Sequence, residues 1–214
     1  MPHYYVETDG EVYLIMENGS WRFPMNKESL PFPVVESHTL QVLGEDVCFC
    51  KPLLPYHPTN WVHKDELIAW DNAVPLVRQA VNTTLPRVVT EGVIVEAGKI
   101  LLVKANRGYN KNRWTLPGGF VGYGESPAQA VVREIQEEVG VPAQAGPLLG
   151  IESFIGQESS LHWHMCFYEA TLLSHDFAPP KDEIEAVCWF SLDDALKAIN
   201  FKNIQRMLRA YFQK

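Results

Sequence analysis

Short stretches of alternating apolar and polar residues fill roughly the first sixty positions of the chain. Asp9-Gly10 and Asn18-Gly19 each separate two β-rich runs, and such turn residues between strand-like runs predict β-hairpins. Residues 29–35 contain two prolines and are expected to be irregular or to form a sheet edge, whereas residues 38–54 return to strand character. The pattern predicts a small, mostly β N-terminal region.

Helical spacing of apolar residues first occurs within residues 63–84. The residues that follow it are Leu67, Ile68, Val74, Leu76, Val77 and Val81. Pro75 interrupts the pattern, so we expect it to kink the helix or to split it in two. We place a domain boundary near Thr84, which gives an N-terminal β-rich domain with a linking helix over 1–84 and a second domain over 85–214.

Strand and helix patterns are mixed in the second domain. Two Val/Ile/Leu-rich runs around Ala97-Gly98 predict a strand–turn–strand over residues 87–106, and further strands are expected within 150–156, 162–173 and 186–192. The C-terminal stretch predicts a helix capped by Ser191, followed by a second helix. The chain as a whole is therefore expected to be of the α+β class.

A third helix is predicted between these strands, after the glycine-rich stretch that ends at Gly124. Ser126 suits the N-cap, Pro127 suits the first helical position, and Gly140 suits a left-handed C-terminal cap. At about 100° per residue, one arc of this helix is apolar and predicts the buried face. That arc consists of Ala128, Val131, Val132, Ile135 and Val139.

A neighbouring arc of the same helix carries Glu134, Glu137 and Glu138. Like charges at this spacing weaken a helix, so their presence needs a reason. Mg²⁺ is held by a few carboxylates together with substrate phosphates, and a bound cation would remove the repulsion. A solvated acidic helix face is the alternative reading of the glutamates alone.

The composition narrows the class of protein. The chain has 214 residues, 46% of them hydrophobic, and a net charge of −8, which does not suit a protein that coats nucleic acid. It has neither a signal-peptide pattern nor an apolar run long enough to span a membrane. Four scattered cysteines suit free thiols in a reducing compartment, so we expect a cytoplasmic protein.

The glutamates belong to a longer pattern. From Gly119 there are five residues to Glu125, then seven more to Arg133-Glu134-Ile135, and Glu137, Glu138, Gly140 and Val141 complete the run. This resembles the Nudix hydrolase signature G, five residues, E, seven residues, R-E-U-x-E-E-x-G-U, where U is aliphatic. A chance match at average residue usage has a probability on the order of 10⁻¹⁰ per start position. With its flanking strands the resemblance extends over residues 87–214, and the N-terminal region lies outside it.

The resemblance implies an α/β/α sandwich with a mixed sheet and a Mg²⁺-dependent pyrophosphohydrolase, with Mn²⁺ as the substitute metal. The implied metal ligands are Glu137 and Glu138 together with the Gly118 carbonyl, and Glu134 joins the metal shell or activates water. The resemblance further implies that Arg133 orients a glutamate. The implied supports of the motif are Gly119, Glu125 and Gly140, and Glu125 would support the loop or bind a further metal.

A basic segment leads into the motif, because residues 97–124 contain no Asp or Glu. We interpret Arg107, Lys111 and Arg113 as substrate-binding residues that contact phosphate, with a solubilising surface loop as the alternative. Trp114 follows them and is a further substrate-binding candidate that could stack on a base, although aromatic residues mostly serve packing.

Candidates also lie outside the motif. Hydrolases that this chain resembles often take a general base from another loop, and Glu183 is our choice over Glu185, with a solvated loop as the alternative. His162 and His164 alternate on a predicted strand and could line a nucleotide pocket, or could be satisfied strand residues.

Cys48 and Cys50 would point to one side of a strand, ahead of His57 and His63. A zinc site and buried thiols are both open, and buried thiols are the reading we favour. The layout is similar to NADH pyrophosphatases, but their four-cysteine zinc ribbon and SQPWPFPxS element are absent. The proline typical of ADP-ribose pyrophosphatases is also absent, because Gly156 and Gln157 stand there.

The sequence therefore predicts hydrolysis of a nucleoside diphosphate linked to another group, such as ADP-ribose, a dinucleotide or a nucleotide sugar. A nucleoside triphosphate such as oxidised dGTP is the second candidate substrate, and a non-catalytic Nudix-like sensor is the alternative of another class. The partner is a small nucleotide, with neither membrane nor nucleic acid expected, and a homodimer is expected. The N-terminal domain would serve dimerisation or substrate selection.

Overall fold

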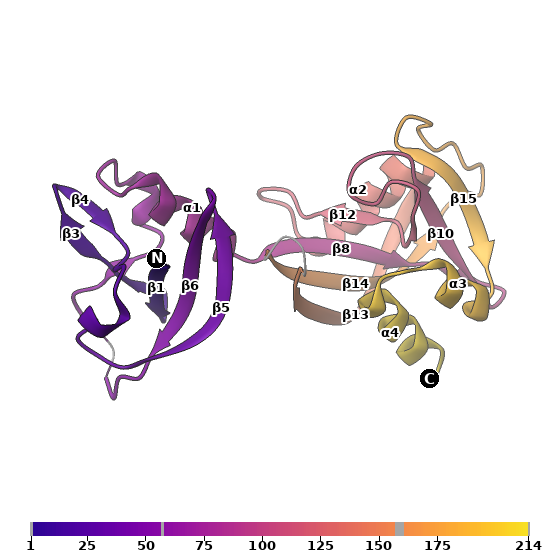
Figure 1. Ribbon diagram of the computed structural model, residues 1–214. Coiled ribbons are helices and arrows are strands. Elements are labelled where there is room, and N and C mark those ends of the chain that lie inside the picture. The colour runs from indigo at the N-terminus through magenta and orange to yellow at the C-terminus, as the bar shows by residue number, and fades with distance from the viewer. Residues whose placement is uncertain (1, 57, 157–160, 214) are drawn as a thin grey trace. The chain divides into compact units, whose positions relative to one another are not determined.

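The computed structural model describes residues 2–56, 58–156 and 161–213. The chain divides into two compact units. One consists of Met1–Leu85 with Ile155–His162, and the other consists of Pro86–Phe154 with Trp163–Lys214 (Figure 1). Each unit has its own buried core.

The N-terminal unit is built on a five-stranded sheet with the order β5-β6-β1-β2-β7. Its strands are β1 (His3–Thr8), β2 (Glu11–Tyr13), β5 (Val34–Val42), β6 (Glu45–Pro52) and β7 (Val62–His63). A separate hairpin joins β3 (Ile15–Glu17) to β4 (Ser20–Arg22). Asp9 and Asn18 adopt a φ of 51° at the two predicted turns, so both hairpins are confirmed. The proline-containing segment leads into β5, which is an edge strand.

Pro75 splits the helical pattern of this unit, as the sequence predicted. A short 3₁₀ helix, η2 (Leu67–Ala69), precedes α1 (Pro75–Thr84), and a second 3₁₀ helix, η1 (Lys27–Ser29), precedes β5. Pro75 occupies the first turn of α1, where its missing N–H has no helical partner to lose. Helix α1 buries Val77 and Val81 in the same core as Tyr5 of β1.

Two four-stranded sheets form the centre of the C-terminal unit. The first has the order β12-β8-β14-β13 and contains β8 (Arg87–Val93), β12 (Gly118–Phe120), β13 (Ala143–Ile155) and β14 (His162–Leu172). It is mixed, because β8 runs parallel to β14 and antiparallel to β12. The second contains β11 (Trp114–Thr115), β10 (Lys99–Ala105) and β15 (Ile184–Phe190), with β9 (Val95–Glu96) paired to β10.

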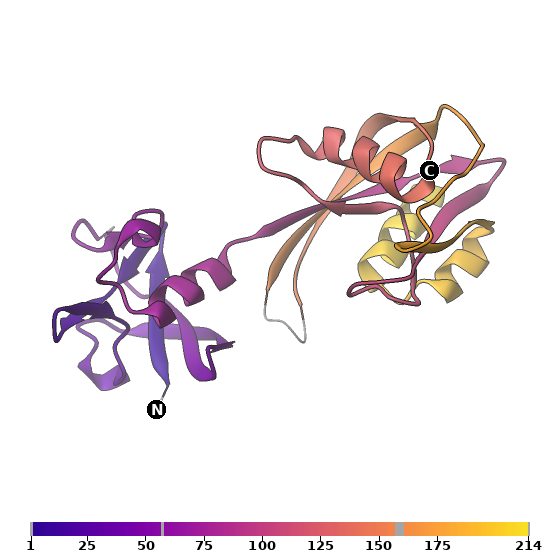
Figure 2. The same cartoon turned by 90° about the horizontal axis from the view of Figure 1, so that it is seen from above.

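Helices cover these sheets on two sides (Figure 2). Strand β10 is buried on both faces, since Leu101 packs in the core that contains helix α2 (Pro127–Val139), while Leu102 packs in the core of helices α3 (Leu192–Ala198) and α4 (Lys202–Phe212). The expected α/β/α sandwich with a mixed sheet is therefore confirmed. Among the described residues no helix is both long and apolar enough to cross a bilayer.

Candidate active site

Helix α2 carries the glutamate motif, and its two ends are fixed as the sequence predicted. Ser126 accepts a hydrogen bond from the backbone N–H of Gln129, whose side chain in turn accepts from the Ser126 N–H, which forms a capping box. Gly140 ends the helix with a φ of 81°. A Cβ added there would lie 2.3 Å from the Ala178 carbonyl oxygen, so a larger residue does not fit.

Arg133 joins the carboxylates of the motif to one another. Its Nε and Nη2 donate to the two oxygens of Glu125 at 2.9 and 3.0 Å, a bidentate pairing. Its Nη1 donates to Glu134 at 2.7 Å and to Glu137 at 2.9 Å. These hydrogen bonds lower the pKa of Glu125 and raise the pKa of Arg133. The predicted orienting role of Arg133 thus has a geometric counterpart, and the guanidinium offsets part of the repulsion among the glutamates.

The glycine-rich loop is tied to the same arginine. Arg133 Nη2 donates to the Phe120 carbonyl at 2.9 Å, and the Gly122 N–H donates to Glu125 at 2.9 Å. Loop and helix therefore form one hydrogen-bonded unit.

The glycines of β12 allow α2 to approach the sheet. The Gly118 N–H donates to Glu138 Oε2 at 2.9 Å. A Cβ on Gly118 would lie 2.1 Å from the Thr90 carbonyl oxygen, and a Cβ on Gly119 would lie 2.5 Å from Glu134 Oε1. The carboxylates of Glu134 and Glu138 are therefore pressed against the backbone of β12.

Burial raises the pKa of two of these carboxyl groups. The pKa of Glu138 is raised to about 8, chiefly by burial, with further contributions from Glu134, Glu183 and Glu137, while the Gly118 N–H acts in the opposite direction. Burial also raises the pKa of Glu134, although Arg133 opposes this. Glu137 is more open to solvent, with 55% of its side chain exposed.

A further acidic residue, Glu91 on β8, was not predicted as a site residue. It is 8% exposed, and its Oε2 has no hydrogen-bond partner within the described structure. Burial, followed by the nearby charges of Glu138 and Glu134, raises the pKa of Glu91 well above its usual range. The signal in the sequence was a glutamate inside a Val-rich strand, but its position beside the motif depends on the pairing of β8 with β12.

A divalent cation fits the donor set of this region. Within the described ranges no three His, Cys, Asp or Glu side chains are placed so that together they could hold a metal ion. Even so, the buried Glu91 Oε2 lacks a partner, and Glu134 and Glu138 lie against glycines that leave room for no other side chain. Oxygen donors of this kind suit Mg²⁺ or Mn²⁺, so the residues present match the group that the motif implies.

The basic segment reaches the site through an ion pair. Arg107 Nη2 lies 2.8 Å from Glu183 Oε2, which joins the predicted phosphate contact to the predicted general base. Glu183 is near enough to raise the pKa of Glu134 and Glu138. Glu185, the rejected alternative, instead pairs with Lys104 at 2.8 Å.

The other substrate-binding candidates lie in different contacts. Lys111 is exposed in the turn between β10 and β11. The Arg113 guanidinium lies over the rings of Tyr109 and Phe201, at 5.4 and 5.8 Å from the ring centres. The ring centres of Trp114 and Phe190 lie 4.8 Å apart in an edge-to-face packing contact.

His164, Cys48 and Cys50 lie in contacts within their own strands and sheets. His164 Nδ1 lies 2.7 Å from Ser153 Oγ, in line with a satisfied strand residue. Cys48 and Cys50 are both buried with their sulfurs 3.7 Å apart, and burial is the main cause that raises the pKa of Cys50 to about 12. His57 lies outside the described residues.

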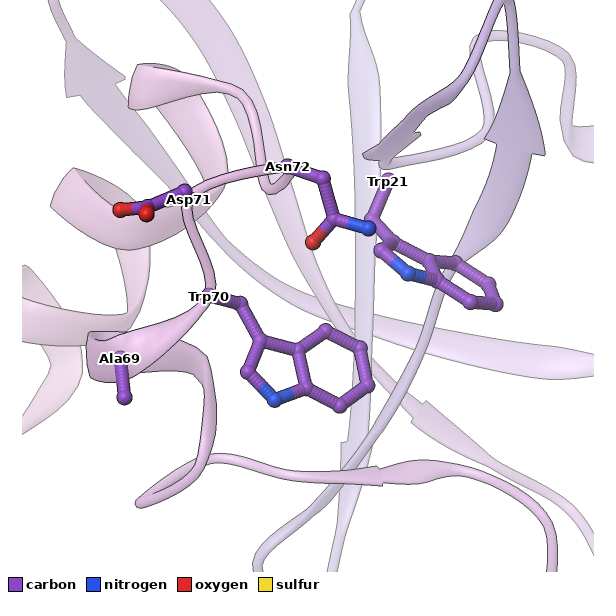
Figure 3. Close-up of a pocket in the computed structure, with 5 residues that line it drawn as sticks. All are labelled: Trp21, Ala69, Trp70, Asp71 and Asn72. Carbon is purple, nitrogen blue, oxygen red and sulfur yellow. The ribbon is translucent and has the colours of Figure 1, made fainter.

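A shallow pocket in the N-terminal unit contains none of these candidates. Its lining residues are Trp21, Ala69, Trp70, Asp71 and Asn72 (Figure 3). The Trp21 and Trp70 rings lie 5.8 Å apart across it, and both indoles belong to the packing around that unit's core.

Comparison with known proteins agrees with the site geometry. The model of the NUDIX domain matches residues 86–211. The chain is 46% identical over 68 residues to an ADP-ribose pyrophosphatase of Methanocaldococcus jannaschii, a match that covers 32% of this chain and 40% of that protein. It is 35% identical over 101 residues to the NAD-capped RNA hydrolase NudC of Pseudomonas aeruginosa, covering 47% of this chain and 35% of that protein.

The chain thus matches less than half the length of these two relatives. Among solved structures, a MutT NUDIX hydrolase from Burkholderia pseudomallei superposes with a TM-score of 0.53 at 33% identity, over 58% of this chain and 97% of that one. The motif, the sandwich that carries it and a domain match over more than half of the chain lead to the same conclusion. The chain belongs to the Nudix hydrolase family.

Proposed function

We propose that the protein is a Mg²⁺-dependent pyrophosphohydrolase, with Mn²⁺ as a substitute metal. The observation that carries the proposal is the placement of Glu134 and Glu138 against the β12 glycines, where Glu138 accepts from the Gly118 N–H at 2.9 Å. Buried carboxylates that repel one another raise the free energy of the folded state. A bound divalent cation would offset this repulsion.

The proposed ligands of the cation are Glu134, Glu137, Glu138 and the Gly118 carbonyl. When bound, the metal neutralises charge on the phosphate oxygens and polarises the anhydride. Arg133 keeps Glu134 and Glu137 in place through its Nη1. The Gly118 N–H fixes the orientation of the Glu138 carboxylate.

Glu183 is the proposed general base. Its Oε2 would accept a proton from the water whose oxygen attacks phosphorus, while the bridging P–O bond breaks and the leaving phosphate departs as an anion. Arg107 holds this carboxylate at 2.8 Å and would contact a phosphate of the substrate. Glu125 and Gly140 would not contact the substrate. Glu125 binds Arg133, and Gly140 ends helix α2.

The proposed substrate is a small nucleotide with a diphosphate, such as ADP-ribose, a dinucleotide or a nucleotide sugar. The products would be a nucleoside monophosphate and a phosphorylated remainder. Lys111 and Arg113 belong to the same basic segment as Arg107 and would favour an anionic ligand. Phe120, which directly follows the site glycines, is 58% exposed, and its ring lies 5.6 Å from that of Trp163, which suits stacking of a base.

We further propose that residues 1–84 form a domain that serves dimerisation or substrate selection, and that the protein works as a homodimer in the cytoplasm. Four free thiols suit such a reducing compartment. Sedimentation of the purified chain tests the dimer, because a monomer at all concentrations would contradict it.

A panel of nucleotides with Mg²⁺ tests the proposed activity. ADP-ribose, dinucleotides, nucleotide sugars and nucleoside triphosphates are each incubated with enzyme, and released phosphomonoester is read by a coupled phosphatase. We expect turnover of a diphosphate-linked substrate that E138Q loses by orders of magnitude while its fold is kept. Preference for triphosphates would favour the second substrate class, and wild-type turnover by E138Q would contradict the assignment.

A further inference from the structure

The candidate active site contains a carboxylate that the Nudix motif does not include. Glu91 lies on β8, two residues from Val89 and two from Val93, and both valines are buried apolar residues of the α3–α4 side. Its cross-strand neighbours are Phe167 on β14 and Gly118 on β12. A valine at this position would continue the apolar face formed by Val89 and Val93. Glu91 instead places a carboxyl group on that face.

The Glu91 carboxylate lies beside Gly118 of β12. A Cβ on Gly118 would lie 3.0 Å from Glu91 Oε2, so this oxygen occupies the space beside Gly118 that a side chain would otherwise take. The N–H of the same glycine donates to Glu138 Oε2 at 2.9 Å. The two carboxylates therefore converge on one backbone residue from different elements, β8 and α2.

Within the described structure, Glu91 Oε2 has no hydrogen-bond partner. A buried carboxyl oxygen left unsatisfied destabilises a fold, and the neighbouring acidic groups add repulsion if it is charged. Arg133 is committed to Glu125, Glu134 and Glu137, and none of its hydrogen bonds reaches Glu91. A hard cation, which prefers oxygen ligands, would give Glu91 Oε2 a partner.

We infer that Glu91 is a further ligand of the divalent cation and shares that ion with Glu138. This inference rests on the proposed function, since it assumes that a cation binds at α2. It adds to the motif a ligand from the sheet, so the donors to the ion would come from β8 as well as from α2. The class of ligand is a hard divalent cation, Mg²⁺ or Mn²⁺, because every donor is an oxygen.

Binding of Mn²⁺ to the full chain in the absence of nucleotide tests the inference without reference to turnover. Calorimetry or Mn²⁺ electron paramagnetic resonance gives the dissociation constant for wild type, E91Q, E138Q and the double variant. We expect E91Q to weaken binding by about tenfold to a hundredfold. If the two carboxylates share one ion, the double variant should lose less than the product of the two single effects.

E96Q is the matched control. Glu96 lies on β9, the next strand along the chain, which pairs with β10. Its side chain is 37% exposed and pairs with His175 at 2.7 Å. E96Q should bind Mn²⁺ as the wild type does. Equal affinities for E91Q and wild type would overturn the inference and leave the proposed function intact. If the wild type itself binds no Mn²⁺, the proposed function fails first, and the inference fails with it.

Stability without metal provides the second measurement. With EDTA present, E91Q should be no less stable than wild type, because it replaces a buried carboxyl group that lacks a partner by an amide of similar shape. A clear loss of stability in EDTA would show that Glu91 is already satisfied without a cation, and would overturn the inference.

Discussion

Replacing Glu138 by glutamine should change how the stability of the metal-free protein depends on pH. The pKa of Glu138 in the folded chain is about 8, against 4.5 for the ordinary group. Between these values the folded protein keeps a proton that the unfolded chain has released. Stability therefore falls as pH rises through this window. Glutamine keeps the shape and can still accept from the Gly118 N–H, but it does not titrate.

The magnitude follows from the proton count. One extra proton bound by the folded state lowers the free energy of unfolding by about 1.4 kcal/mol for each pH unit inside the window. From about pH 5.5 to 7.5 the contribution of Glu138 amounts to roughly 3 kcal/mol, a large fraction of the stability of an ordinary domain. The free energy of unfolding of E138Q should therefore fall by about 1.4 kcal/mol less per pH unit than that of wild type.

Urea unfolding in EDTA at a series of pH values measures the slope, with each transition fitted separately because the two units can unfold independently. E137Q is the control, because Glu137 lies on the same helix surface with 55% of its side chain exposed. Parallel slopes for wild type and E138Q would refute the reasoning, because they would mean that burial does not hold the Glu138 proton.

Three further changes test other parts of the site. G119A would place a Cβ 2.5 Å from Glu134 Oε1, so we expect kcat to fall by about a hundredfold with an unchanged circular dichroism spectrum. Neutralising Arg107 and Lys111 together should raise KM for a diphosphate substrate. An unchanged KM would mean that the basic segment is a solubilising surface loop and does not bind phosphate. G140A should lower stability in urea by about 1–3 kcal/mol, because it combines a positive φ with a backbone clash; wild-type stability would contradict the role of Gly140 as the helix cap.

Features set by neighbours in the sequence were predictable. The caps of α2 depend on Ser126, Pro127 and Gly140, which act within one turn of each helix end, and the hairpin turns depend on two residues each. Glutamates three and four positions apart must share a helix surface, so Glu134 and Glu138 could be placed together from spacing alone.

Features set by contacts between distant segments were not predictable. Glu91 reads as part of a Val-rich strand, and only the register of β8 against Gly118 brings it to the motif. The arc predicted to be buried on α2 left out Ala130, which is fully buried. The ring contact of Trp114 likewise depends on Phe190, which lies far along the chain.

The most direct test of the central claim follows phosphorus itself. The ³¹P spectrum of ADP-ribose is recorded with enzyme and Mg²⁺, then with EDTA, and then with E138Q. With the wild type and Mg²⁺, the two diphosphate signals should be replaced by two phosphomonoester signals. In EDTA and with E138Q, the two diphosphate signals should persist. Unchanged diphosphate signals for ADP-ribose and for the other diphosphate-linked nucleotides of the panel, or equal conversion by E138Q, would contradict cleavage of an anhydride by the carboxylates of α2.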